Sequence, residues 1–308
     1  MTPPTASSSS PWKTQAVGAL LFLAAAAGNA SAAPGCLATA TQIPSPPRAL
    51  AMAAFAQQEQ QAFGNQTMDA EGRLTNAGDS EAEDMRRPPQ NLAPWQRVLG
   101  YWQATGVRLR GVDTDQGADS SEPASIDAAL SRVAVIDTPW SAAFVSWLAR
   151  QSGLGPDEFV FSEAHVDYAG AAWKAGIDEA AGRATPYAMR ACDLTLTPPR
   201  IGDIVCQARG AGAGIDTYGK IGEVLAQRPT GGDALPMHCD VVVAVDATGF
   251  DTVGGNLLQS VTLRRLAFAP GTRLLDPSYL PEGCTAGAPG CTDRHMSRQP
   301  WSLLLQWR

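Results

Sequence analysis

The sequence predicts an α+β fold, in which helices come first and a run of antiparallel strands follows. In the first half of the 308-residue chain, apolar residues recur at helical spacing. From Arg200 onward the spacing becomes that of strands, rich in β-branched residues. The hydrophobic content of 44% is enough for one sizeable core. We therefore expect a single domain over residues 48–308.

The chain begins with the pattern of a secretory signal peptide. Lys13 precedes an apolar run over residues 16–27, and Ala30-Ser31-Ala32 fits a cleavage site. We expect residues 1–32 to be removed and residues 33–47 to form a flexible lead-in. Cys36 leaves lipid anchoring as a minor alternative. No other stretch approaches the length of a membrane span, so a periplasmic or secreted protein is expected.

Five helices are expected before residue 175. They are predicted over 48–63, from Leu92 to about Thr105, from Ser125 or Asp127 onward, from Pro139 to about Gln151, and from about Ser162 to Lys174. Between them, residues 64–90 and 108–125 are polar and are expected to be loop insertions.

Five strands are expected in the second half. They are predicted after a turn within Arg200–Cys206, over Pro236–Val245, at the stretch Thr252–Asn256 that leads into the third strand, over Ser260–Leu266 and over Trp301–Trp307. The segment 209–214 between the first two is glycine-rich and begins with an arginine. It looks like a phosphate cradle but lacks the strand-then-helix setting of one, so we interpret it as a flexible loop.

The helix that begins near Pro139 is apolar on every side and is therefore predicted to be buried. Thr138 is a candidate N-cap, and Pro139 suits the first turn. Ser141 lies in that first turn, where free N–H groups and the positive end of the helix favour a developing anion. Ser141 is therefore the candidate nucleophile.

Two further residues complete a candidate acyl-transfer site. His238 begins the second predicted strand, and Asn256 stands at the entrance to the next. Acyl transfer needs a nucleophile, a base and a group that orients the base. Asp240 is the second choice for orienting His238, because strand alternation places both on one face.

The cysteines are compatible with disulfides in an exported chain, because all six follow the expected cleavage site. Cys284 and Cys291 enclose a short loop sequence and are the best candidate pair. Cys192 and Cys206 are the next candidate pair. Buried free thiols remain the alternative.

Composition also argues against several partners. A net charge of −7 provides no basic stripe for nucleic acid. The spacing of His, Cys and Asp residues matches no closed zinc pattern, so no metal is expected. Nothing in the sequence predicts a cofactor. The protein partner, if there is one, stays unknown.

The run Pro139-Trp140-Ser141-Ala142-Ala143-Phe144-Val145-Ser146 resembles the nucleophile helix of the CHAP and NlpC/P60 papain-like peptidoglycan hydrolases. Two further elements of these domains are matched by Gly202-Asp203-Ile204-Val205 and by the strand that starts at His238. The polar element Gly254-Gly255-Asn256 follows, as it often does in these domains. The likeness covers roughly residues 92–266. In particular, the chain looks like the exported bacterial family DUF2272.

This resemblance implies a papain-like fold, with helices packed on a small antiparallel sheet or barrel. It also implies that Ser141 takes the place of the family's catalytic Cys and His238 that of the base. Trp140, next to Ser141, is expected to wall the substrate cleft. His165 and Tyr168, one turn apart on a helix, are expected either to line that cleft or to be structural.

The expected function is hydrolysis of an amide bond in peptidoglycan peptides by an exported enzyme. A Ser hydroxyl is harder to activate than a Cys thiol, because it cannot be pre-ionised by a neighbouring His. The alternative is therefore a catalytically inactive relative that binds peptidoglycan or another envelope ligand through the same cleft.

Overall fold

A computed structural model of the chain describes residue 1 and residues 34–39, 44–106, 124–136, 138–227 and 235–308. The expected signal peptide and most of the loop expected at 108–125 lie outside the described residues. None of the described helices combines the length and the apolar character needed to cross a membrane.

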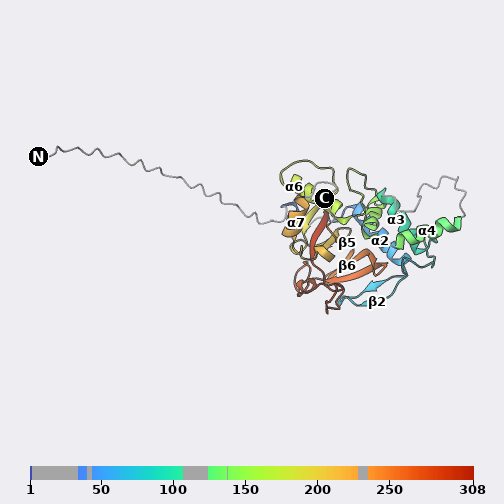
Figure 1. The fold of residues 1–308 in the computed structure, drawn as a ribbon. Coiled ribbons are helices and arrows are strands. Elements are labelled where there is room, and N and C mark those ends of the chain that lie inside the picture. The colour runs from blue at the N-terminus through green and yellow to red at the C-terminus, as the bar shows by residue number, and fades with distance from the viewer. Residues whose placement is uncertain (2–33, 40–43, 107–123, 137, 228–234) are drawn as a thin grey trace.

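The described part of the chain has an α+β fold, as the sequence predicts, built on one sheet of eight strands (Figure 1). The strand order is β2-β1-β7-β6-β5-β4-β8-β3, and the sheet does not close. The strands are β1 (Thr67–Met68), β2 (Leu74–Asn76), β3 (Met189–Asp193), β4 (Ile204–Ala208), β5 (Met237–Val245), β6 (Gly249–Leu257), β7 (Ser260–Ala267) and β8 (Trp301–Trp307).

The expectation of a small antiparallel sheet or barrel needs correction. The sheet is open and mixed, because β1 pairs with β7 in parallel. Strands β1 and β2 fall inside the polar segment that was expected to be loop, and β3 was not expected at all. Its sequence, Met-Arg-Ala-Cys-Asp, contains no β-branched residue.

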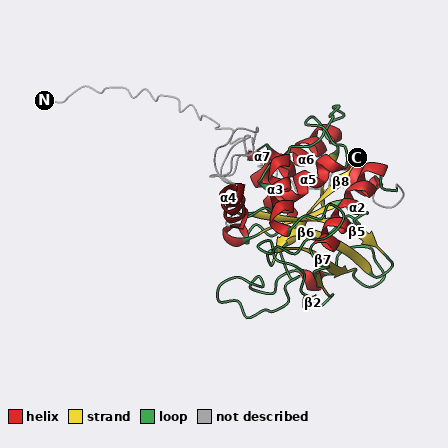
Figure 2. Ribbon diagram, turned by 90° about the vertical axis from the view of Figure 1, so that its right-hand side faces the viewer, coloured by secondary structure: helices red, strands yellow, loops and turns green. Residues whose placement is uncertain are grey.

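Seven α-helices are described, and Figure 2 shows most of them gathered on one side of the molecule. They are α1 (Pro34–Thr39), α2 (Pro47–Ala62), α3 (Pro94–Thr105), α4 (Ala124–Ile136), α5 (Ser141–Gln151), α6 (His165–Ala180) and α7 (Tyr218–Gln227). Helices α2 and α5 pack on β5 and β6, α3 packs on α5, and α6 packs on β3.

Both faces of the sheet are buried, and strand alternation decides which face each side chain joins. On β5, Cys239, Val241 and Val243 pack into the large core shared with α2 and α5. Val242 instead packs into a second cluster with Phe250, Trp301 and Leu304, on the other face. Since side chains alternate along a strand, His238 and Asp240 share the face of Val242.

Three disulfides are present in the described part of the chain. Cys284–Cys291 forms as the sequence predicts. The expected Cys192–Cys206 pair is wrong, because β8 lies between the strands that carry these residues. Cys206 instead bonds Cys239, its direct cross-strand partner, and Cys192 bonds Cys36.

The bond from Cys36 also changes the interpretation of the lead-in. Residues 34–39 form helix α1, which the expectation of a flexible segment over 33–47 missed. The sulfur of Cys36 is held by Cys192 and buried, so it is not free for lipid attachment.

The Gly202-Asp203 motif fixes the start of β4. Gly202 has φ +86°, and a Cβ there would lie 2.3 Å from the carbonyl oxygen of Ala49, so α2 could not approach as closely. The Asp203 carboxylate accepts hydrogen bonds from the backbone N–H groups of Arg200 and Trp307. Burial raises the pKa of Asp203 to about 6, although Arg200 and these hydrogen bonds act to lower it.

This pKa predicts a pH-dependent stability. An unfolded Asp has a pKa of about 3.9, so the folded state binds this proton more tightly. Asp203 therefore favours the folded state below about pH 4, and that stabilisation is lost as the pH rises through about 6. Over this range we expect its contribution to the free energy of unfolding to fall by about 3 kcal/mol. Urea unfolding at pH 4–8 measures this. The Asp203→Asn variant should lack that component, and an identical pH profile for both proteins would contradict the assignment.

Candidate active site

Ser141 is the first residue of α5, and Trp140 is its N-cap. The helix therefore begins later than the sequence suggests. The hydroxyl of Thr138, the expected N-cap, instead donates to the carbonyl oxygen of Ala134. The start of α5 still carries backbone N–H groups that have no acceptor within the helix. Ser141 itself is buried, with only 2% of its surface exposed.

Trp140 anchors this helix start. Its indole N–H donates to Oε2 of Glu81 at 2.6 Å, and its ring packs against Phe63 and Tyr101. The side chain is fully buried and does not line the large pocket described below. The expectation that Trp140 borders a substrate cleft stays a prediction, and Trp140 is not among the residues that line this pocket.

The structure pairs Ser141 with His165, the first residue of α6. Ser141 Oγ lies 2.7 Å from Nε2 of His165. The other ring nitrogen of His165, Nδ1, contacts the hydroxyl of Tyr168 one turn along the helix. Ser146 and Ser162 bring the two helices together. The Ser146 hydroxyl donates to the carbonyl oxygen of Ser162 and accepts from its N–H.

A second pair lies beside the first. His238 Nε2 is 2.8 Å from Oδ1 of Asp240 on the same strand, and the His165 and His238 rings meet edge to face at 5.5 Å. Asp240 also accepts a hydrogen bond from Thr252 and faces Arg264 at 3.6 Å. The four groups Ser141, His165, His238 and Asp240 therefore form one buried row.

Among the described residues, the structure shows no hydrogen bond between Ser141 and His238, although the resemblance pairs them. His165 takes the position next to Ser141 instead, and Nε2 of His238 is held by Asp240. Of the two residues considered for holding His238, Asp240 makes the contact. Asn256 lies at the end of β6 with φ +56° and lines the pocket.

Burial sets the charge states of these groups. It lowers the pKa of His165 well below its ordinary value, and the neighbouring His238 and Arg209 lower it further. Burial also lowers the pKa of His238, although Asp240 opposes this. For Asp240, burial acts to raise the pKa, but Arg264 and His238 outweigh it and keep the pKa below its usual value. At pH 7 the row thus holds two neutral imidazoles and one carboxylate.

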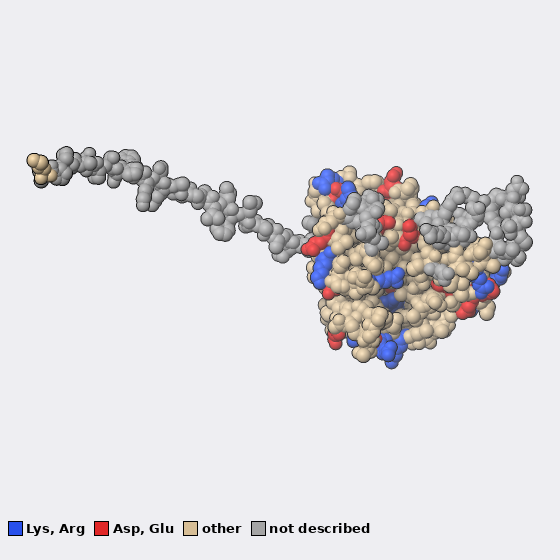
Figure 3. Space-filling model, viewed as in Figure 1, with Lys and Arg blue, Asp and Glu red and all other residues tan. Residues whose placement is uncertain are grey.

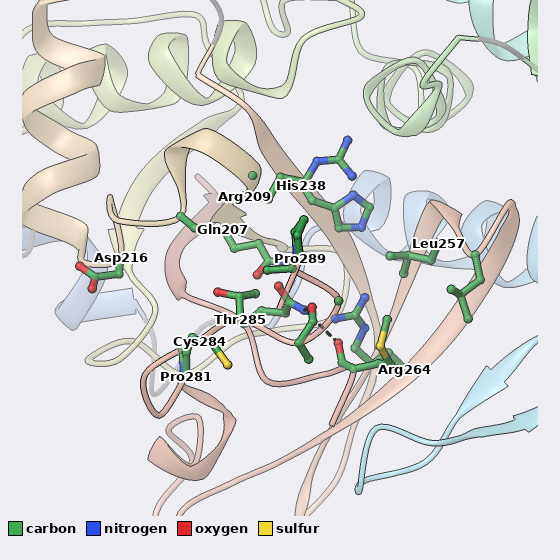
Figure 4. Close-up of a pocket in the computed structure, with 18 of the residues that line it drawn as sticks. Gln207, Arg209, Asp216, His238, Leu257, Arg264, Pro281, Cys284, Thr285 and Pro289 are labelled. Carbon is green, nitrogen blue, oxygen red and sulfur yellow. Dashed lines mark hydrogen bonds between the residues drawn. The ribbon is translucent and has the colours of Figure 1, made fainter. Parts of the chain in front are cut away.

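His238 also borders a pocket of about 840 Å³ on the side of the sheet away from α5. One wall comes from strands β4 to β7, and the opposite wall is the loop that contains the Cys284–Cys291 disulfide (Figure 4). Ser141 and His165 are not part of this lining. Figure 3 shows acidic and basic side chains scattered over the face in view, without a large patch of either sign.

Comparison with known proteins identifies the family of this chain. The family described as an uncharacterized protein conserved in bacteria (DUF2272) matches residues 89–307. The chain belongs to the DUF2272 family. No curated protein and no solved structure matches it. The DUF2272 match spans every residue of the buried row, while α2 and β1 lie before it and complete the core and the sheet.

Sequence reasoning missed two polar residues of the pocket and interpreted the segment that begins at a third, Arg209, as a flexible loop. Gln207, Arg209 and Arg264 line the pocket, and Arg264 is buried beside Asp240. Strand alternation on β7 places Arg264 on the same face as Ser260, Thr262 and Leu266, none of which is exposed. This alternation was the available signal for a buried arginine. No cluster of three or more His, Cys, Asp or Glu side chains suited to a metal occurs in the described ranges.

The pKa directions predict the titration of both imidazoles. We expect His165 and His238 to be neutral at pH 7 and to titrate below pH 6.5, with His165 the lower of the two. The ¹⁵N shifts of the ring nitrogens report this, and the variants His165→Ala and His238→Ala assign the signals. Titration of either ring above its ordinary pKa of about 6.5 would contradict the burial argument.

Proposed function

We propose that this DUF2272 protein is a serine hydrolase of the cell envelope that cleaves an amide bond in peptidoglycan peptides. The observation that carries the proposal is the 2.7 Å contact between Ser141 Oγ and Nε2 of a neutral His165 at a helix start. A hydroxyl nucleophile needs a base at hydrogen-bond distance that can accept its proton as it attacks.

The proposed chemistry follows the geometry. His165 Nε2 takes the Ser141 proton as Oγ attacks the amide carbonyl, and the N–H groups at the start of α5 stabilise the oxyanion. The imidazolium then donates its proton to the departing amine, and water hydrolyses the acyl-enzyme with His165 again as base. His238, whose ring is held by the ionised Asp240, stands behind His165 and limits the movement of its ring.

This assignment differs from the one that the resemblance implies. The Nε2 atom of His238 is engaged by Asp240, and His165 stands at the nucleophile instead. His238 and Asp240 are therefore proposed as positioning residues, and the base is His165. Tyr168 fixes the His165 ring through Nδ1.

Two observations support a location of the protein in the cell envelope. Disulfides persist in oxidising compartments, and three are present among the described residues. The first 32 residues have the pattern of a signal peptide. The choice of peptidoglycan rests on the likeness to CHAP and NlpC/P60 motifs.

A second candidate function is a binding module without catalysis. The observation that favours it is the burial of Ser141, which is 2% exposed and absent from the pocket lining. In that case the pocket beside His238 holds an envelope ligand, and the Ser141–His165 contact only joins two helices.

Digestion of purified peptidoglycan, followed by mass spectrometry of the soluble products, separates the two functions. We expect products from the wild-type protein and a loss of about 10³-fold or more in rate for Ser141→Ala and for His165→Ala. Removal of His238 should cost less, because it acts through His165. Melting temperatures should accompany every variant to show that it is folded.

Ser278→Ala is the matched control, since Ser278 is an exposed serine in the short 3₁₀ helix Pro277–Tyr279, outside the buried row and the pocket lining. It should digest like wild type. Identical product profiles for wild type and folded Ser141→Ala would contradict the hydrolase and favour the binding module.

A further inference from the structure

Arg209 holds a positive charge that nothing in the described structure neutralises. It follows β4 and is partly buried, and its guanidinium has no hydrogen bond or ion pair with any described residue. Burial lowers its pKa, and no carboxylate acts in the opposite direction. A partly desolvated charge without a partner is costly in free energy, and proteins retain one mainly where a ligand supplies the opposite charge.

Other polar atoms around the same pocket also lack partners. They are Nδ1 of His238, Oε1 of Gln207 and Nη1 of Arg264, on side chains that are 1%, 3% and 2% exposed. Buried polar groups are normally hydrogen-bonded, so several unpaired ones around one cavity indicate a polar ligand. In the view of Figure 4, the His238 ring lies between the guanidinium of Arg209 and that of Arg264, with Gln207 to one side of them.

The charged side chains around the pocket indicate which charge a ligand would carry. Asp240 compensates Arg264, and Asp216 at the pocket margin is paired with Lys220 at 2.7 Å. His238 is neutral at pH 7. One positive charge is therefore left over, which matches a monoanion such as a carboxylate better than a phosphate carrying nearly two charges.

The rest of the lining fits a peptide. The remaining pocket residues are mostly small or apolar, among them Met68, Leu257, Pro281, Ala286 and Pro289. The glycine-rich segment after Arg209 does not form a phosphate cradle, because the flanking strands β4 and β5 are antiparallel neighbours. It contributes small residues that leave the guanidinium accessible from the pocket.

We infer that this pocket binds the carboxylate of a peptide ligand through Arg209. The guanidinium donates two parallel hydrogen bonds to the carboxylate, and Arg264 adds a further donor. If the protein acts as proposed above, the ligand is the substrate, and the recognised peptide carries a free carboxylate next to the scissile region. The binding itself does not depend on catalysis.

Calorimetry with acetyl-D-alanyl-D-alanine and its C-terminal amide tests the inference. The titrations use the Ser141→Ala protein, so that turnover plays no part. We expect the acid to bind about tenfold or more tightly than the amide, because a charge-assisted pair is lost in the amide. Arg209→Gln should abolish this preference without lowering the melting temperature, since the Arg209 guanidinium makes no hydrogen bond to a described residue that could be lost.

Arg273→Gln is the matched control, because it makes the same substitution at an exposed arginine outside the pocket lining and should keep the preference. Equal binding of acid and amide, no binding of the acid, or a preference that survives Arg209→Gln would overturn the inference. Tighter binding of inorganic phosphate than of the acid would overturn the assignment to a carboxylate. Acid-selective binding without any digestion of peptidoglycan would instead refute only the hydrolase.

Discussion

The arrangement of the site depends on one buried carboxylate. Asp240 has no exposed surface, and an ionised carboxylate in that position is stable only when it is paired and hydrogen-bonded. His238, Thr252 and Arg264 meet this need from three adjacent strands. Asp240 thereby fixes the His238 ring, leaves its Nδ1 facing the pocket and holds Arg264 over the ring of Trp301.

The same constraint explains the glycine pair of β6. A Cβ on Gly254 would lie 2.0 Å from Oδ1 of Asp240, and one on Gly255 would lie 2.7 Å from the ring of Trp140. The two glycines make room for the carboxylate on one side and for the start of α5 on the other. The Gly-Gly-Asn element thus serves packing around the site, whichever role Asn256 has.

Much of the fold could be predicted from local pattern, and the site only in part. Helix α5 and strands β5 and β8 have strong apolar signals and lie close to their predicted places. Helix α7, with two glycines in ten residues, carries a weak signal and was missed. The pairing of Ser141 with His165 depends on how α6 docks on α5 through Ser146 and Ser162, and this contact leaves no trace in local spacing.

The Ser141–His165 pair and the pocket meet at His238. This side chain touches His165 with one edge and borders the cavity with the other. Hydrolysis therefore requires that Ser141 become reachable from the cavity, whereas ligand binding requires no change in the row. The two proposed functions differ in this requirement and share the pocket.

The most direct test of the buried row is the pKa of a thiol introduced by Ser141→Cys. All six native cysteines are in disulfides, so this thiol is the one free thiol of the chain. Its thiolate can be followed by ultraviolet absorbance, which needs no reagent to enter the site. Because the thiol would lie next to His165, we predict a pKa that shifts on His165→Ala and changes less on His238→Ala. A pKa that responds to His238→Ala and not to His165→Ala would contradict the row and return the base to His238.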